Sequence, residues 1–524
     1  MRATRRRRLV ALRGSYRAKP EGARIVGPVD PDDTVVVWVY LKNPAVRTHA
    51  PGSAADLAAL ASFTTRRALA RQRAAEYRPA LAAIRNFAKS NGIAVRSFQA
   101  GRRCVVLKGS SANMSKAFGA SLRLYRDGER TFRARSGSLK IPLSIARWTR
   151  AVLGFDQRPQ ARLRSLAADG TDSGLWPSEV ARLYGIPLDA NDPQQCVGII
   201  ALGGGYLPLD VQDAATQAGC PAPTIVECSA DGTSNQFGGG TPADEEIALD
   251  MQVVAGIVPA VKIVVYFAQN TAVSLAAAIH TAVFDDVNRP TVLSISWGSA
   301  EKVWKPGPRD AVQAALADAV RLKISVTAAS GDFLATGGLN DGAAHVFFPS
   351  SSPYVLGCGG TRITLRDDAI SNEEVWKENI TGTGGGISDN FQVPVYQTHV
   401  PLPRSVTSGA VGRGVPDVAA AAAAVPVPGY RIVVGGNPIV KDGTSAAAPL
   451  WAAIIALANA RRNSPLGLVN PSLYANPAPF RPITSGDNRA GGIGYDAAPG
   501  VIWNACTGLG APKGAEVVAA LAHV

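Results

Sequence analysis

The sequence predicts an α/β protein in which a parallel sheet flanked by helices follows a smaller α+β module. Length is the first observation, because 524 residues exceed one ordinary domain and favour two. The second is a series of short apolar strands separated by helix-length segments, a pattern typical of a parallel sheet. The third is charge. Residues 1–165 carry 34 Lys and Arg against 9 Asp and Glu, which leaves 20 against 31 for the rest of the chain.

Residues 31–160 have the pattern of the smaller module. A strand–helix–strand order that ends in a hairpin favours a compact α+β unit. Residues 1–30, rich in Arg, Gly and Pro, are expected to form a flexible basic N-terminus. The expected elements are strands at 34–41 and 104–107, helices at 77–90 and 111–118, and a hairpin that turns at Asp127 and Gly128.

The larger domain is expected to span residues 175–524. Residues 161–174 show no apolar periodicity and predict a linker. In a parallel sheet, functional side chains come from loops at the carboxyl ends of the strands. The expected strands lie at 197–202, 224–227, 262–267, 291–296 and 323–328.

Ser445 stands between a Gly-Thr turn and an apolar, alanine-rich run that continues to Ala460. Unpaired N–H groups and the positive end of the helix dipole at such a helix start favour developing negative charge. The position therefore suits a nucleophilic hydroxyl. It also suits an ordinary N-cap, with Thr444 or Ser445 capping a helix that tolerates Pro449 near its start.

A base for this serine is not found among the histidines. The motif Gly443–Pro449 resembles the serine motif of the subtilisin-like fold, but none of the five histidines has the His-Gly-Thr-His context of its base. A helix start at Thr241 and Pro242 instead carries Glu246 and Asp250, four residues apart on one face. Paired carboxyl groups can share a proton, which lets a Glu act as a base in acid. The alternative is a solvated acidic first turn.

Four motifs occur in the order seen in the sedolisins, the serine-carboxyl peptidases. The chain resembles kumamolisin-like members of that family over nearly its whole length, and residues 31–160 resemble the activation domain of pro-sedolisins. The resemblance implies a subtilisin-like fold, a zymogen that is processed within residues 161–174, and an extracellular enzyme. The motifs are the Glu246/Asp250 pair, Ser294–Gly298, Ser330–Asp332 and Gly443–Ser445.

The resemblance also implies roles. Ser445 would attack the peptide carbonyl, and Glu246, oriented by Asp250, would take the proton and return it to the leaving amine. Asp332 matches the family's oxyanion residue and, when protonated, would donate a hydrogen bond to the tetrahedral intermediate. Its alternative is a turn aspartate after a glycine. Because the base must be ionised and the donor protonated, we expect activity in acid.

Several positions bear on the substrate pocket. Trp297 stands where relatives place a tryptophan near the catalytic Glu, and a packed core indole is the alternative. Gly384 and Gly385 are expected to line the substrate. Phe347 replaces an acid that in some relatives prefers basic substrate residues, which predicts a more apolar pocket. Ala201 replaces a glutamate that extends the proton network of kumamolisin-like enzymes, so the base is expected to be less well supported.

The chemistry is expected to need no cofactor, and the family's structural calcium site is altered. Pro482 and Asn504 replace its two aspartates, which leaves carbonyl groups at Ile483 and Gly500 beside the Asn504 side chain. A hard divalent ion prefers several charged oxygens. We therefore expect calcium to bind weakly or to be absent.

The expected partners are a polypeptide substrate and the chain's own basic prodomain, docked on the acidic catalytic domain and loosened in acid. A nucleic-acid tail is the alternative suggested by Arg5–Arg8, and we expect none. No run of 18 apolar residues predicts a membrane span, and Leu9–Leu12 is too short for a signal core. The six cysteines form no CxxC pair; a Cys220–Cys228 loop is conceivable, but free thiols are expected.

The leading functional hypothesis is an acid-acting serine endopeptidase that is made as a zymogen and works as a monomer. A tripeptidyl-peptidase of the same family is one alternative. A catalytically impaired, peptide-binding homologue is another, suggested by Ala201 and the lost calcium ligands.

Overall fold

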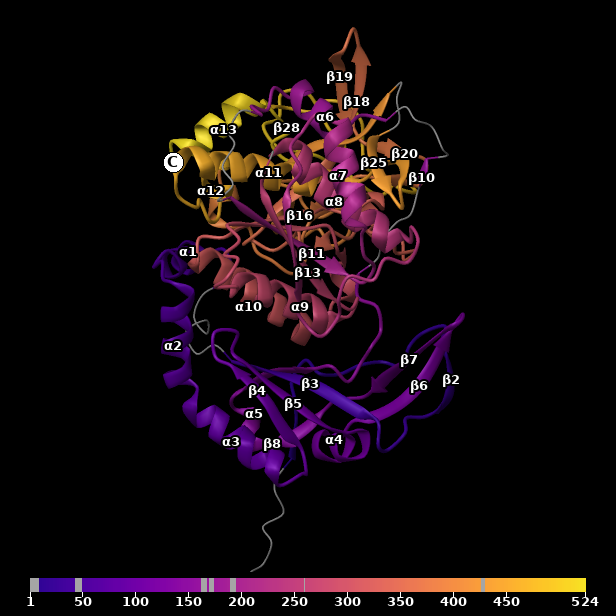
Figure 1. The fold of residues 1–524 in the computed structure, drawn as a ribbon, viewed down its shortest axis with the longest axis vertical. Coiled ribbons are helices and arrows are strands. Elements are labelled where there is room, and N and C mark those ends of the chain that lie inside the picture. Colours follow the sequence, from indigo (N-terminus) through magenta and orange to yellow (C-terminus); the bar gives the residue numbers. More distant parts are fainter. Residues whose placement is uncertain are drawn as a thin grey trace, which may run out of the picture.

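The computed structural model of the chain describes residues 9–42, 50–161, 167–168, 174–188, 195–258, 260–425 and 429–524. Figure 1 shows a smaller N-terminal part in indigo and purple and a larger part in magenta to yellow. The predicted fold class, a parallel sheet flanked by helices behind a smaller α+β module, is confirmed.

The N-terminal domain (residues 9–161) is built on a four-stranded sheet of order β4-β5-β3-β9. β3 (Thr34–Leu41) has the predicted bounds, and alternate valines along it are buried. This is the two-residue period of a strand with one face in a core. The predicted helices form as α3 (Arg78–Lys89) and α4 (Ser111–Phe118), and the predicted hairpin as β6 (Ser121–Asp127) and β7 (Arg130–Ser136).

The expected flexible N-terminus is wrong in part, because residues 9–30 contain two strands. β1 (Leu9–Ala11) pairs with β8 (Lys140–Pro142), and β2 (Arg24–Pro28) pairs with β6. These partners are more than 90 residues away along the chain, so local composition could not reveal them. The remaining elements of this domain are α1 (Ala54–Leu60), α2 (Arg66–Glu76), β4 (Ala94–Gln99), β5 (Cys104–Ser110), α5 (Leu143–Ala146) and β9 (Thr149–Leu153).

The C-terminal domain (residues 174–524) is organised around an eight-stranded sheet of order β12-β13-β11-β14-β16-β18-β19, with β24 paired to β18. The pairs are parallel apart from β18–β19. The strands are β11 (Cys196–Leu202), β12 (Thr224–Ser229), β13 (Lys262–Ala268), β14 (Val292–Ile295), β16 (Ser325–Ala329), β18 (Leu356–Arg366), β19 (Ala369–Val375) and β24 (Val418–Val425).

Helices cover both faces of this sheet. α8 (Pro242–Ile257) and α11 (Thr444–Arg462) lie on one face, and α9 (Ala272–Val283) and α10 (Pro306–Arg321) lie on the other, as Figure 1 shows. The side chains of β11 alternate between the two cores that result. This explains why β11 is apolar at every position.

Shorter elements complete the C-terminal domain. The helices are α6 (Pro177–Leu183), α7 (Pro208–Gln217), α12 (Asn470–Ala475) and α13 (Gly514–Ala522). The strands are β15 (Ser299–Ala300), β17 (Phe347–Phe348), β20 (Lys377–Glu378), β21 (Thr381–Gly382), β22 (Gly386–Ile387), β23 (Gly414–Val415), β25 (Tyr430–Val434), β26 (Asn437–Lys441), β27 (Phe480–Arg481) and β28 (Ala511–Pro512). β10 (Ala167–Ala168), which precedes this domain in the chain, pairs with β26.

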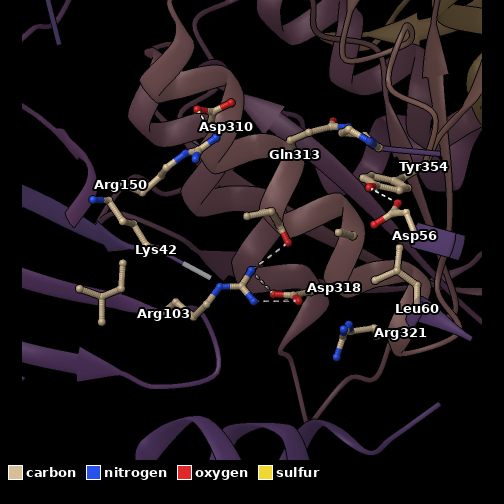
Figure 2. Close-up of a pocket in the computed structure, with 14 residues that line it drawn as sticks. Lys42, Asp56, Leu60, Arg103, Arg150, Asp310, Gln313, Asp318, Arg321 and Tyr354 are labelled. Atoms are coloured by element: carbon tan, nitrogen blue, oxygen red, sulfur yellow. Dashed lines mark hydrogen bonds and ion pairs between the residues drawn. The ribbon is translucent and has the colours of Figure 1, made fainter. Parts of the chain in front are cut away.

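The N-terminal domain docks against α9 and α10, below them in Figure 1. Arg73 and Arg103 both donate to Asp318 of α10, at 2.6 and 3.0 Å, and all three side chains are buried. Arg150 of β9 pairs with Asp310 of the same helix at 2.6 Å. A cavity of about 400 Å³ lies between the domains beside these pairs, with basic and acidic side chains on its wall, as Figure 2 shows.

Candidate active site

The start of α8 is fixed by a capping box. The Thr241 hydroxyl accepts from the Asp244 amide, and the Asp244 carboxylate accepts from the Thr241 amide at 2.8 Å. Pro242 occupies the first turn, where its missing N–H costs nothing. The predicted helix start is confirmed, and it sets the direction in which Glu246 and Asp250 project.

Glu246, Asp250 and Ser445 meet between α8 and the first turn of α11. The Ser445 hydroxyl lies close enough to the Glu246 carboxyl group to act on it as a hydrogen-bonding neighbour that lowers its pKa. Glu246 and Ser445 are each 6% exposed, and Asp250 is fully buried. The structure therefore brings together the three residues for which the sequence predicted nucleophile, base and orienting acid.

Ser296, directly after β14, connects the carboxyl pair to the serine turn. Its hydroxyl donates to Asp250 Oδ1 at 2.6 Å and lies 3.4 Å from the Ser445 carbonyl oxygen. That carbonyl group lacks its usual helical donor, because Pro449 stands four residues later and has no N–H. Ser296 lies in a motif predicted from the sequence, but it was not itself among the residues predicted to have a role. Its place at the carboxyl end of a strand was the available signal.

Burial raises the pKa of both acids of the pair. For Glu246, the hydrogen bond from Ser445 acts against this rise and the charge of Asp332 adds to it. For Asp250, the charge of Glu246 adds to the rise. Two buried carboxyl groups one helical turn apart hold a proton between them instead of ionising together.

Asp332 follows β16 and lies against the turn that carries Ser445. Its Oδ1 accepts from the Thr444 amide at 2.8 Å and from the Thr444 hydroxyl at 2.6 Å. A side chain at Gly443 would place its Cβ 3.1 Å from Asp332 Oδ2, so glycine gives this carboxyl group room. With φ of +141°, Gly443 also has a backbone conformation that disfavours other residues.

The predicted pocket residues lie around the same turn. Gly384 donates to the Gly331 carbonyl oxygen at 2.6 Å, and a Cβ at Gly384 would lie only 2.3 Å from the Ser330 oxygen. Gly385 is packed as closely, 2.1 Å from the Ala505 oxygen by the same measure. Phe347 is buried with its ring over Gly331. Contact with substrate at these positions stays a prediction.

Trp297 is 1% exposed and belongs to the core on the α9 and α10 face. Its indole N–H has no hydrogen-bond partner among the described residues. Ala201 is fully buried in the opposite core and brings no polar group to the site.

Two of the three residues predicted to remain from a calcium site, Ile483 and Asn504, are hydrogen-bonded to each other, and Gly500 takes no part in this contact. The Asn504 amide donates to the Ile483 carbonyl oxygen at 3.1 Å, and Asn504 Oδ1 accepts from the amides of Cys506 and Thr507 at 2.9 Å. This donor uses one of the two lone pairs of the Ile483 oxygen, and the Asn504 oxygen already accepts from two amides, so the set offers a cation no charged oxygen. Weak or absent calcium binding stays a prediction. In the described part of the chain, no cluster of three or more His, Cys, Asp or Glu side chains could hold a metal ion.

All six cysteines are free thiols, as expected, including Cys220 and Cys228. None of the helices in the described part of the chain combines the length and apolar character of a bilayer-spanning segment.

Two family models match the chain. Pro-kumamolisin, activation domain, matches residues 21–158, and the Subtilase family matches residues 231–473. With the fold and the serine turn described above, these matches define a subtilisin-like serine peptidase preceded by an activation domain. The N-terminal domain is therefore called the prodomain below.

Comparison with individual relatives identifies the family within this class of serine peptidases. Kumamolisin of Bacillus sp. (strain MN-32) is 37% identical over 532 residues, which cover 97% of this chain and 96% of that protein. Tripeptidyl-peptidase sed5 of Aspergillus fumigatus is 26% identical over 581 residues, which cover 98% of this chain and 97% of that protein. The solved structure of Pseudomonas sedolisin, a serine-carboxyl proteinase complexed with pseudo-iodotyrostatin, aligns with a TM-score of 0.57 at 27% identity, over 67% of this chain and 98% of that one. The chain belongs to the sedolisin family of serine-carboxyl peptidases, and it is a hydrolase.

Proposed function

We propose that this peptidase is an endopeptidase that works in acid and is made as a zymogen. The observation that carries the proposal is the approach of the Ser445 hydroxyl to Glu246, with Asp250 beside Glu246 and Asp332 against the serine turn. No cofactor takes part. Ser445, Glu246, Asp250 and Asp332 supply the nucleophile, the base, its partner and the oxyanion donor.

The reaction proceeds through an acyl-enzyme. Ser445 Oγ attacks the peptide carbonyl carbon while its proton moves to the Glu246 carboxylate. The C–N bond then breaks as Glu246 returns that proton to the leaving amine. Water, deprotonated by Glu246, attacks the ester and releases Ser445 with its proton restored. Asp332, protonated in acid, donates to the oxyanion of both tetrahedral intermediates.

Asp250 explains how a buried base can be ionised in acid. Glu246 Oε1 and Asp250 Oδ2 are the two buried oxygens of the pair that have no hydrogen-bond partner among the described residues. A single proton placed on Asp250 and shared with Glu246 satisfies both oxygens and leaves the negative charge near Ser445. Asp250 is fully buried and lies beside the charge of Glu246, so its pKa is raised, which favours this location of the proton.

In the zymogen the prodomain is docked on the catalytic domain, and it dissociates in acid. In support, the docked domains bury Arg73 and Arg103 on Asp318, so the two halves of opposite charge meet through paired groups. We propose an extracellular location, which the family resemblance supports, and assay of culture medium against cell lysate tests it. The polypeptide substrate enters after the prodomain has been cut away.

A tripeptidyl-peptidase is the second candidate function, favoured by the relative of that name that covers 98% of this chain. Peptides with a blocked N-terminus separate the two candidates, because only an endopeptidase cuts internal bonds of a blocked peptide. A catalytically impaired homologue would cut neither blocked peptides nor peptides with a free N-terminus.

Incubation of the purified full chain at about pH 4 tests the main proposal, since carboxyl groups titrate in this range. We expect a product shortened from the N-terminal side, cleavage of a blocked peptide, and neither event in the Ser445→Ala variant. Processing of Ser445→Ala at the rate of the parent protein would contradict the proposal.

A further inference from the structure

A buried lysine lies beside the serine turn, and the mechanism above does not use it. Lys441 ends β26, four residues before Ser445, and is 4% exposed. Its Nζ lies 2.7 Å from Glu245 Oε2, and Glu245 is the residue before the base Glu246 in the first turn of α8. A charge at such depth is stable only when it is paired.

Lys441 brings a positive charge into a group of acids. Glu246 faces Ser445 of α11, Asp250 and Glu245 of its own helix, Asp332 after β16 and Lys441 of β26. Of the two members of the ion pair, Lys441 lowers the pKa of Glu246 and Glu245 raises it, with Lys441 the stronger. Lys441 also acts on the half-buried Asp442, whose pKa is raised to about 7 by desolvation, with Glu378 and Asp332 adding to the rise and Lys441 opposing it.

We infer that Lys441 and Glu245 form a positioning pair that sets the charge of the base: Lys441 keeps Glu246 ionised at the acid end of the working range, and Glu245 holds the ammonium group in place. The inference rests on the proposed role of Glu246. Neither residue touches the reacting atoms; the pair acts through Glu246 alone.

Lys441 and Glu245 shift the pKa of Glu246 in opposite directions, and this difference can be tested. In a purely structural pair, which ties β26 to α8, loss of either partner weakens the same contact and has effects of the same kind. A charge-setting pair behaves differently. Loss of the cation makes Glu246 harder to ionise, and loss of the neighbouring anion makes it easier, so the two substitutions move the pH profile in opposite directions.

The experiment measures kcat/KM against pH for the processed enzyme on a blocked peptide. We expect Lys441→Met to move the acid limb of the profile upwards by at least about half a pH unit, and Glu245→Gln to move it downwards. The double variant returns towards the parent, and Lys441→Arg keeps the limb in place because it keeps the charge. Lys513→Met, which breaks the exposed Lys513–Glu516 pair at 3.6 Å, is the control for loss of a lysine elsewhere.

Equal losses at every pH, or shifts of both single variants in one direction, would overturn the inference while leaving the proposed function intact. Absence of any Ser445-dependent cleavage by the parent protein would overturn the proposed function itself, and this inference with it. Glu245→Gln is isosteric and carries the test alone if Lys441→Met does not fold.

Discussion

The ring of Tyr40 in the prodomain lies against the ring of His280 in α9, with centroids 5.7 Å apart and planes at 33°. Both residues are buried, and neither the Tyr40 hydroxyl nor His280 Nε2 has a hydrogen-bond partner among the described residues. Burial lowers the pKa of His280 from 6.5 to about 3, and nearby Arg103 acts in the same direction against the opposing charge of Asp318. Docking therefore holds this imidazole neutral.

This contact predicts that prodomain docking weakens as the pH falls. When the prodomain leaves, Tyr40 and Arg103 leave with it and Asp318 stays beside the histidine, so we expect the pKa of His280 to rise. A group whose pKa is lower in the docked state opposes docking once the pH is below its free pKa. Each pH unit below the pKa of the undocked histidine, down to about 3, then weakens docking by about tenfold.

Protonation of the carboxyl groups at the interface does not weaken docking in mild acid in the way that protonation of His280 does. Arg103 and Arg73 lower the pKa of Asp318 below its ordinary 3.8, so its contribution is lost only in stronger acid. Burial raises the pKa of Asp310 despite Arg150, and protonation of Asp310 therefore favours the docked state.

Hydrogen exchange of α9 and β3 amides in the full-length Ser445→Ala protein measures this release. We expect protection to be lost between pH 6.5 and about 3, and at lower pH in a His280→Gln background. His399→Gln, which replaces an exposed histidine, is the matched control. Loss of protection at the same pH with and without His280 would rule out this role.

The buried pairs on Asp318 predict a large effect of Asp318→Asn at neutral pH. The substitution leaves Arg73 and Arg103 buried without a countercharge, which typically costs about 3–5 kcal/mol. We expect the docked state of the Ser445→Ala protein to open at about pH 7, measured by the same exchange experiment. Asp341→Asn, at an exposed ion pair with Lys302, should leave docking intact. Exchange equal to the parent would show that these pairs add nothing.

Ser296 predicts a catalytic effect without contact to substrate. Ser296→Ala removes the hydrogen bond to Asp250 and leaves a buried carboxyl oxygen unpaired, at a cost of about 1–3 kcal/mol. We expect kcat to fall about tenfold or more with KM little changed, because the base is less well oriented. Ser296→Thr, which keeps the hydroxyl, should recover part of the rate. A change in KM alone would assign Ser296 to substrate binding.

Asn504 predicts stability that does not depend on calcium. The Asn504 side chain donates to the Ile483 carbonyl oxygen and accepts from the amides of Cys506 and Thr507. Asn504→Ala therefore leaves the buried Ile483 oxygen without this donor. We expect the free energy of unfolding to fall by about 2 kcal/mol. EDTA should not change the melting temperature of the parent protein. A drop in that temperature that added calcium reverses would contradict this account.

The sequence predicted the elements whose pattern is local. β3 and α4 have the predicted bounds, and the acids of α8 and the serine of α11 could be placed from a helix cap and a glycine turn. Long-range relationships were missed. β1 and β2 are ordered by partners far along the chain, and Lys441 meets Glu245 across 196 residues. Such pairs follow from sheet and helix packing, which no local spacing encodes.

The most direct test of the central claim is the rate at which the full chain shortens itself at about pH 4 when Glu246 is replaced by glutamine. Glutamine fills the same space but cannot take the proton from Ser445. We predict that Glu246→Gln slows the reaction at least about a hundredfold, whereas Glu516→Gln, an exposed acid of α13, leaves it unchanged. A Glu246→Gln protein that shortens as fast as the parent would contradict the claim that this carboxyl group is the base.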